Sequence, residues 1–589
     1  MRLAWLDWLI VIGTLILAFL PALLFAARAG RSTTEFFASG RSAPWWLIGV
    51  SMVATTFAAD TPNLVTDLVR QHGIAGNWVW WAFLLSGMAT VMFYARMWRR
   101  SGVLTDLEFY ELRYSGRGAR VVRAFRAIYL GLVFNVVLMA IVNLAAVKIA
   151  SILLGWEMQR TLIWCAILSG GFAMVSGLWG VLLVDLVQFG IAMSGAVAAA
   201  WFALQQPQVN GLQSLFERLP PQSLNFLPDS SDPATFVAVL LLPLAVNWWA
   251  VWYPGSEPGG GSYIAQRMLA ARSERDAMAG TLFFNVAHYA IRTWPWIIVG
   301  LSSLLVFPTL ADLSRQFPSV PTQLIGHDIA YPAMLTLLPV GWLGLVVAGL
   351  LAAYVSTIVT HLNWGSSYLV HDLYRRFVVP AADEAHYVRV SRVATAMLMC
   401  FAAWLTPYID TASAGFTLLL SIGAGTGPIY LLRWYWWRVN AAAEIVAMIA
   451  SFSTAVVFLM IAANGTPVDA NTSMLTTVAI TTLAWLLAVF FGPQNDAATL
   501  EHFYRAVRPA GPGWRKVRTA TGLEPSPDSL PNAMLGWVLG ILFVYAAMFG
   551  LGAWLAGRTT LALVWAALFI ASGTALARVL GTFRSAQQT

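Results

Sequence analysis

Two long hydrophobic segments of this chain are interrupted in the middle by residues that break a helix. The first interruption covers residues 54–62 and contains Asp60 and Pro62; the second covers residues 253–261 and contains Glu257 and three consecutive glycines. Backbone groups at bilayer depth must be hydrogen-bonded, so an unwound stretch persists there only inside protein or beside a wet cavity. We therefore expect both interruptions to border a buried site.

Apolar runs of spanning length recur along the whole chain. Hydrophobic residues make up 59% of the 589 residues and charged residues only 11%. About 20 apolar residues cross a bilayer as a helix, so we predict an all-α polytopic membrane protein with about 15 transmembrane helices. The predicted helices lie near residues 5–27, 44–67, 77–97, 121–154, 159–180, 182–206, 234–253, 277–307, 329–373, 388–407, 414–434, 440–463, 473–492, 531–556 and 559–581.

The interrupted segments are the second and the seventh of these helices. An offset of five helices is typical of transporters built from two inverted repeats. We predict a peripheral helix and connection (1–43), a first repeat (44–206), an extracellular loop (207–233), a second repeat (234–438), peripheral helices (439–492), a basic cytoplasmic linker rather than a folded domain (493–530) and C-terminal peripheral helices (531–589).

Arginines gather in alternate connections, such as 96–126 and 267–275, and the positive-inside rule makes these connections cytoplasmic. The net charge of +8 therefore reports topology rather than a nucleic-acid partner. We expect an integral protein of the plasma membrane, namely a bacterial inner membrane, with its N-terminus outside and its C-terminus in the cytoplasm. Lys148, near the outer end of its helix, is expected to extend toward the interface.

Residues Ala353, Ser356, Thr357 and Thr360 lie along one face of the predicted helix 329–373. Sodium is a hard cation that prefers several oxygen ligands, and an unwound helix supplies free carbonyl groups. Serine and threonine also bond to the preceding turn or join helices in membranes. Taken alone, this pattern favours the packing role.

Further motifs change that balance, because in chain order they resemble the sodium:solute symporter family. The resemblance extends from about Thr34 to Arg438 and implies a LeuT-like core of five plus five helices, with sodium as the coupling ion. The matching stretches are Phe36–Trp46, Gly177–Val181 followed by Asp185 and Gln188, Gln266–Arg267, and Ala352–Thr357.

Carried over position by position, the resemblance implies a sodium site. Its ligands would be the backbone carbonyls of Ala54, Phe57 and Ala353 and the hydroxyls of Ser356 and Thr357.

Some relatives hold a second sodium, for which Asp185, Ser356 and Thr360 match, but Val359 stands where another hydroxyl is expected. Asp185 is then either a waypoint for sodium that leaves to the cytoplasm or a charge at the start of its helix.

The substrate positions depart from those of sugar-transporting relatives, whose polar contacts align here with Thr61, Trp80, Gly261 and Ile291. Ionisable residues inside the membrane are functional candidates by default. Arg292 either clamps an anionic group of the solute or pairs with an acidic residue, and His288 either packs or carries a proton. The predicted substrate-binding residues are Asp60, Thr61, Trp80, Glu257, Gly261, His288 and Arg292.

These features predict a sodium-coupled symporter that imports a small polar organic solute (a sugar, a carboxylate or an amino-acid-like compound) by alternating access. We expect it to act as a monomer in the bilayer and not as an enzyme, because no nucleophile–base set is recognisable. Two alternatives stay open: coupling to protons instead of sodium, and a transporter-like membrane sensor. A sensor would need a signalling domain, for which residues 493–530 are too few.

Overall fold

The structure is a computed structural model of the 589-residue chain. It describes residues 3–29, 41–103, 105–173, 178–251, 257–409, 416, 419, 420, 423, 425–466 and 468–583. The secondary structure of these residues is helical, with one isolated backbone bridge between Ala43 and Ala271. Ten of the described helices are long and apolar enough to cross a membrane, which confirms the all-α polytopic class.

The helices of the first half begin and end as follows, with η marking 3₁₀ and π turns: α1 Trp5–Ala29, α3 Trp45–Thr55, α4 Asp60–His72, η2 Ile74–Asn77, α5 Trp78–Trp81, α6 Leu84–Ala89, η3 Thr90–Tyr94, α7 Ala95–Ser101, α8 Glu108–Arg113, α9 Gly116–Ile128, η4 Tyr129–Phe134, α10 Asn135–Leu154, α11 Met158–Ala173, α12 Leu178–Leu204, α13 Leu212–Arg218, α14 Pro221–Leu224, α15 Pro233–Phe236, η5 Val237–Leu241, α16 Leu242–Ala245 and η6 Asn247–Trp249.

The second half continues with α17 Ser262–Ala270, α18 Glu274–Val286, η7 Ala287–Ile291, α19 Thr293–Val306, α20 Leu310–Gln316, η8 Thr322–Leu324, η9 His327–Ile329, α21 Ala330–Leu335, α22 Trp342–Ser367, η10 Tyr368–Val378, α23 Glu384–Leu405, η11 Thr406–Tyr408, α25 Gly427–Tyr435, α26 Ala441–Ala463, α27 Ala470–Phe491, α28 Ala497–Val507, η12 Pro512–Trp514, α29 Arg515–Thr521, α30 Leu530–Leu555 and α31 Thr559–Gly581.

The predicted helix 329–373 begins later than expected. The spanning helix α22 starts only at Trp342, because Pro339 lacks a backbone N–H and Gly341 adopts a left-handed φ of +89°. The segment before it forms the separate short helix α21. Most of the predicted helix 414–434 lies outside the described residues. Its last part is helix α25.

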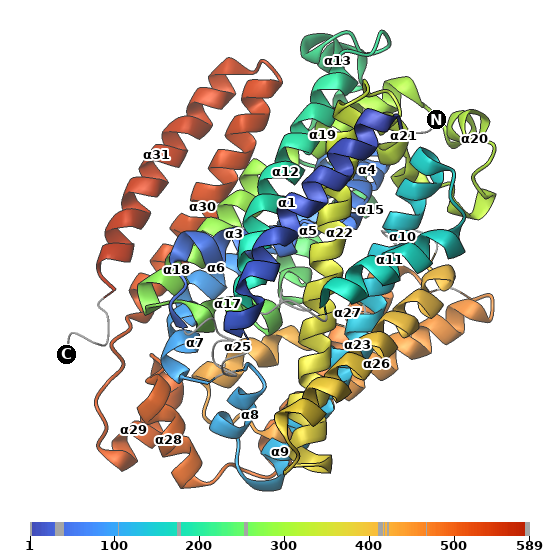
Figure 1. The fold of residues 1–589 in the computed structure, drawn as a ribbon. Helices are drawn as coiled ribbons and strands as arrows, with labels where there is room; N and C mark the ends of the chain where they lie inside the picture. The colour runs from blue at the N-terminus through green and yellow to red at the C-terminus, as the bar shows by residue number, and fades with distance from the viewer. Residues whose placement is uncertain are drawn as a thin grey trace.

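The connections between spans lie at two opposite ends of the molecule (Figure 1). Helices α13 and α20, from the connections poor in arginine, lie at one end, and the arginine-bearing α8 and α9 lie at the other. The segment 493–530 is more ordered than a linker: α28 packs against α7 and α8, with Phe503 and Trp514 buried.

Both interruptions lie where hydrophobic helices stop inside the protein. Helix α3 ends at Thr55, whose neighbour Thr56 turns its hydroxyl back onto the Val53 carbonyl (2.9 Å), and α4 resumes at Asp60. In the second interruption the described part is residues 257–261, before α17 begins.

Two glycines shape this second stretch. Gly259 and Gly260 have φ of +83° and +78°, which L-residues with a side chain rarely adopt.

The two interrupted segments are joined at one end of the core. The backbone N–H of Ala43, just before α3, donates to Ala270 at the end of α17 (3.1 Å), and Arg272 donates back to Ala43 (3.1 Å). Helix α3 also packs between α18 and α12, and α12 packs on α22. The hairpins α26–α27 and α30–α31 are peripheral to this core.

Candidate functional site

A small cavity lies beside the first interruption, and five of the predicted substrate residues line it. They are Asp60, Thr61, Trp80, His288 and Arg292. The other described lining residues are mostly apolar: Thr56, Ala58, Leu64, Val65, Leu138, Ile141, Phe416 and Leu419. The cavity volume available to water is about 30 Å³. The cavity must therefore widen to bind a solute.

A π turn positions the Arg292 side chain at this cavity. Within the span 274–306 the chain switches to the π segment η7, and the Arg292 N–H bonds to Ala287, five residues earlier (3.2 Å). Such turns re-aim side chains and occur at functional sites. The Arg292 guanidinium thereby crosses to α3, where Nη1 donates to Thr56 Oγ1 (3.3 Å) and the Val53 carbonyl (3.5 Å).

His288, one turn before Arg292, is an acceptor for the same guanidinium. Arg292 Nη2 donates to His288 Nδ1 (2.6 Å), and Nε donates to the His288 carbonyl (3.3 Å). The guanidinium also faces the rings of Phe57 and Trp296, at 5.9 and 5.3 Å from their centroids. Arg292 is therefore held by protein groups from both broken and unbroken helices.

Asp60 and Trp80 complete the polar and aromatic lining. Asp60 is the first residue of α4, close enough to Arg292 for their charges to interact, and its Oδ1 is buried without a hydrogen-bond partner. Trp80 stacks on Tyr289 (5.8 Å between centroids), and its indole N–H donates a hydrogen bond to Asn77 Oδ1 (2.9 Å). Only the ring of Trp80 is left to face a solute.

Glu257 and Gly261 do not line this cavity. Glu257 instead lines a second cavity, which shares His288 with the first. Its lining mixes polar residues (Ser86, Thr90, Thr281, Asn285) with apolar and aromatic ones (Phe83, Ile264, Phe284, Tyr289). Gly261 lies directly against the Glu257 side chain, since a Cβ there would come within 2.6 Å of Glu257 Oε2. The two cavities thus follow one another on either side of His288.

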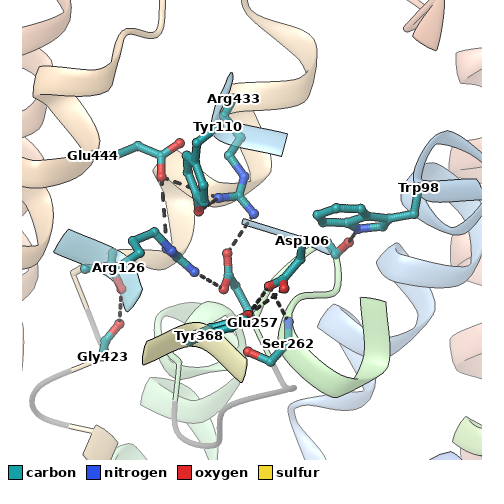
Figure 2. A network of polar contacts seen from close by, with 12 residues as sticks. Trp98, Asp106, Tyr110, Arg126, Glu257, Ser262, Tyr368, Gly423, Arg433 and Glu444 are labelled. Atoms are coloured by element: carbon teal, nitrogen blue, oxygen red, sulfur yellow. Dashed lines mark hydrogen bonds and ion pairs between the residues drawn. The ribbon is translucent and has the colours of Figure 1, made fainter. Parts of the chain in front are cut away.

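The Glu257 carboxylate is held in a buried cluster of charges (Figure 2). Its Oε2 lies 2.5 Å from Arg126 Nη2 in α9, and its Oε1 lies 2.7 Å from Arg433 Nη2 in α25. Glu444 in α26 pairs with the same two arginines, at 4.0 and 3.4 Å. All four side chains are at most 2% exposed. We refer to these four residues as the charge cluster.

A second carboxylate, Asp106, fixes the end of the same interruption. It accepts hydrogen bonds from the backbone N–H of Ser262 (2.8 Å) and from the Tyr368 hydroxyl (2.5 Å). The Trp98 indole donates to the carbonyl of Gly259 (2.8 Å). Residues 257–262 are thus tied to α7, α9, α25 and η10 rather than left loose.

The predicted sodium ligands lie on two elements that meet. The hydroxyl face of α22 contacts the end of α3, with Thr357 Oγ1 donating to the Thr55 carbonyl (3.3 Å). The Ala54 carbonyl already accepts the Phe57 N–H (3.0 Å) but has a second lone pair. Ala353 and Ser356 are buried on the same α22 face. This donor set consists of oxygens only, as a hard cation requires.

Asp185 connects the helices around this point. It accepts from Ser51 Oγ in α3 (2.6 Å) and from Ser356 Oγ in α22 (2.7 Å). Arg267 in α17 lies 3.7 Å from the carboxylate and donates to Ser51 (3.1 Å) and Thr55 (3.3 Å). Arg267 and Ser51 received no role in the sequence analysis.

Near Asp185, three polar side-chain atoms of the described residues on α12 and α22 are buried without a hydrogen-bond partner. They are both amide atoms of Gln188, one turn after Asp185 on α12, and the hydroxyl of Thr360 on α22. The described helices around Asp185 thus keep oxygen and nitrogen atoms that could bind water or a passing ion.

Lys148 differs from its sequence prediction. Its ammonium does not extend to an interface but lies buried, 2.7 Å from Asp328 Oδ2 just before α21. A buried lysine requires such a partner. Asp328 lies in the short turn η9, before α21, which hydropathy does not single out.

Broken helices around a buried cavity, with an oxygen-bearing helix against the first break, define a secondary transporter with a LeuT-like core. The fold agrees with a solved sodium-coupled sialic acid symporter in a substrate-bound, outward-open state. The TM-score is 0.62 at 17% identity, over 84% of this chain and 99% of that chain.

The chain belongs to the sodium:solute symporter family, whose model matches residues 36–451. It is 24% identical to a sodium/glucose cotransporter of Vibrio parahaemolyticus over 450 residues, which is 72% of this chain and 78% of that protein. It is also 24% identical to the sodium/glucose cotransporter 4 of Danio rerio, over 70% of this chain and 65% of that protein. The chain is therefore an integral membrane symporter with sodium as its coupling ion.

Proposed function

We propose that this symporter imports a small polar organic solute that binds beside Asp60 and Arg292. Asp60, Thr61, Trp80, His288 and Arg292 line this cavity together. It lies at the break of a helix, where backbone groups and ionisable side chains converge away from lipid. The solute would then pass His288 into the second cavity, which is lined by Glu257, with Gly261 against the Glu257 side chain.

Sodium would bind between α3 and α22 and tie the broken helix to the unbroken one. The ligands would be the carbonyls of Ala54, Phe57 and Ala353 and the hydroxyls of Ser356 and Thr357. The observation that carries this assignment is the direct contact of Thr357 with the Thr55 carbonyl, 3.3 Å, at the point where α3 ends. An ion that binds one conformation better shifts the equilibrium toward it.

Asp185 would receive sodium on its way to the cytoplasm, with Thr360 on the same route. Its carboxylate is hydrogen-bonded to Ser356, a ligand of the proposed site, at 2.7 Å. Arg267 would balance the charge of Asp185 whenever sodium is absent. Release is favoured on the inside because an inside-negative potential contributes about 2.3 kcal/mol per charge per 100 mV.

The transporter would act as a monomer by alternating access in a bacterial inner membrane, with its arginine-rich end in the cytoplasm. No bond is made or broken in the solute, so no enzymatic step is needed.

The test is sodium-dependent thermal stabilisation of the purified full chain. Replacing potassium by sodium should raise the melting temperature, and Ser356→Ala with Thr357→Ala should raise the half-saturating sodium concentration at least tenfold. Ser194→Ala on α12, an exposed serine that bonds only its own helix, is the matched control and should leave sodium binding unchanged. Unaltered sodium dependence of the double variant would remove the proposed site.

A further inference from the structure

Hydrogen-bonding capacity in the solute cavity is unevenly distributed. Each guanidinium nitrogen of Arg292 has a protein acceptor: the His288 carbonyl for Nε, Thr56 Oγ1 for Nη1 and the His288 ring for Nη2. Asp60 Oδ1 is the one buried polar side-chain atom without a partner among the described residues that line this cavity. The buried atom without a partner is therefore an acceptor, and the Thr61 hydroxyl, which also lines the cavity, can donate or accept.

An ionised carboxylate has only acceptor sites, so its counterpart must be a hydrogen-bond donor. A buried carboxylate oxygen that lacks a hydrogen-bond donor is unfavourable, and charge-assisted hydrogen bonds are roughly twice as strong as neutral ones. Arg292 interacts with Asp60 through charge, but the hydrogen bonds of its three nitrogens run to Thr56, Val53 and His288. A positively charged donor thus satisfies Asp60 better than a hydroxyl does.

The remaining lining also disfavours a polyhydroxylated solute. Five of the lining side chains cannot form hydrogen bonds: Leu64, Val65, Leu138, Ile141 and Leu419. Several sugar hydroxyls buried against them would be left without hydrogen-bond partners, which is unfavourable. The indole N–H of Trp80 already donates to Asn77. Its ring adds a π face that attracts cations.

We infer that Asp60 is a specificity-determining residue, and that it recognises a protonated nitrogen on a solute whose body is mostly apolar. The inference rests on the proposed function, because it assigns the solute class of the same cavity. It differs from the sugar specificity that the names of the curated relatives state. The solute class would be an amine or an amino-acid-like compound.

The local potential can be measured without knowing the solute. In a Cys165→Ala, Cys400→Ala background, Thr61→Cys is labelled with cationic 2-aminoethyl or anionic 2-sulfonatoethyl methanethiosulfonate. Relative to a free thiol in solution, the cationic reagent should react at least tenfold faster than the anionic one. Asp60→Asn should abolish this preference and Asp60→Glu should keep it. Equal rates with Asp60 present would overturn the inference.

A second arm tests recognition in sodium by thermal shift with L-proline, L-valine and L-leucine, their N-acetyl forms, D-glucose and acetate. An amine-bearing compound should stabilise the chain, its N-acetyl form should not, and Asp60→Asn should weaken the effect at least tenfold. Stabilisation by D-glucose or acetate that survives Asp60→Asn would overturn the inference. Failure of the sodium site would appear instead in the Ser356→Ala, Thr357→Ala variant and leave the labelling preference intact.

Discussion

At the scale of single residues, Arg292 shows what burial does to an ionisable side chain in this protein. The sequence left two roles open, an anion clamp and a structural partner. In the structure its guanidinium holds the end of α3 through Thr56 and the Val53 carbonyl. These acceptors would lose their donors if the side chain were removed. We therefore expect Arg292 to support the geometry of the first break, whatever the solute.

Arg292→Ala should lower stability with and without solute, by about 2 kcal/mol, since hydrogen bonds to a charged group are lost. The measurement is the melting temperature of the purified variant in sodium, with carboxylate compounds added or omitted. Arg315→Ala, which removes an exposed arginine paired only with Asp312, should change little. A variant with normal stability that fails only to bind carboxylates would restore the anion-clamp role.

At the same scale, the sequence located ionisable residues but not their partners. Asp60, His288 and Arg292 were singled out because charge is rare in spans, and they do line one cavity. The pairing of Asp185 with Arg267 and of Lys148 with Asp328 was not foreseen. Such pairs join residues more than 80 positions apart, and hydropathy carries no information on which helices meet.

At the scale of elements, the described part of the second broken segment is held by buried charges. Glu257 is bound to Arg126 and Arg433 from two different helices. Arg126 was read from the sequence only as a mark of topology, and Arg433 was not singled out. The charge cluster therefore links the break to α9, α25 and α26. Movement of this segment during transport requires those pairs to separate or to move as one unit.

Glu257→Gln should leave two buried arginines with Glu444 as their only carboxylate partner within the charge cluster. Breaking a buried pair in this way lowers stability by about 3–5 kcal/mol. Denaturant midpoints of the purified variant would measure the loss. The control is Glu501→Gln, which breaks the exposed pair with Arg505 on α28 and should change stability by less than about 1 kcal/mol. Equal losses of stability in the two variants would show that the charge cluster does not stabilise the fold.

At the scale of the whole molecule, the sequence predicted most of the architecture and the family. Long apolar runs placed the ten spans that the structure describes, of about 15 expected, and the arginine-bearing α8 and α9 lie at the end opposite α13 and α20 (Figure 1). What it could not place were irregular joints: the late start of α22 after Pro339, and the packing of α28 on α7 and α8. These depend on contacts between distant segments rather than on local composition.

The central claim, sodium-coupled import, is tested most directly by uptake into proteoliposomes of the solute that stabilises the chain. With an inward sodium gradient, the solute should accumulate above its external concentration and should leak out when the gradient is dissipated. The Ser356→Ala, Thr357→Ala variant should equilibrate the solute at most. Accumulation that persists without a sodium gradient, or that a proton gradient drives equally well, would contradict the account.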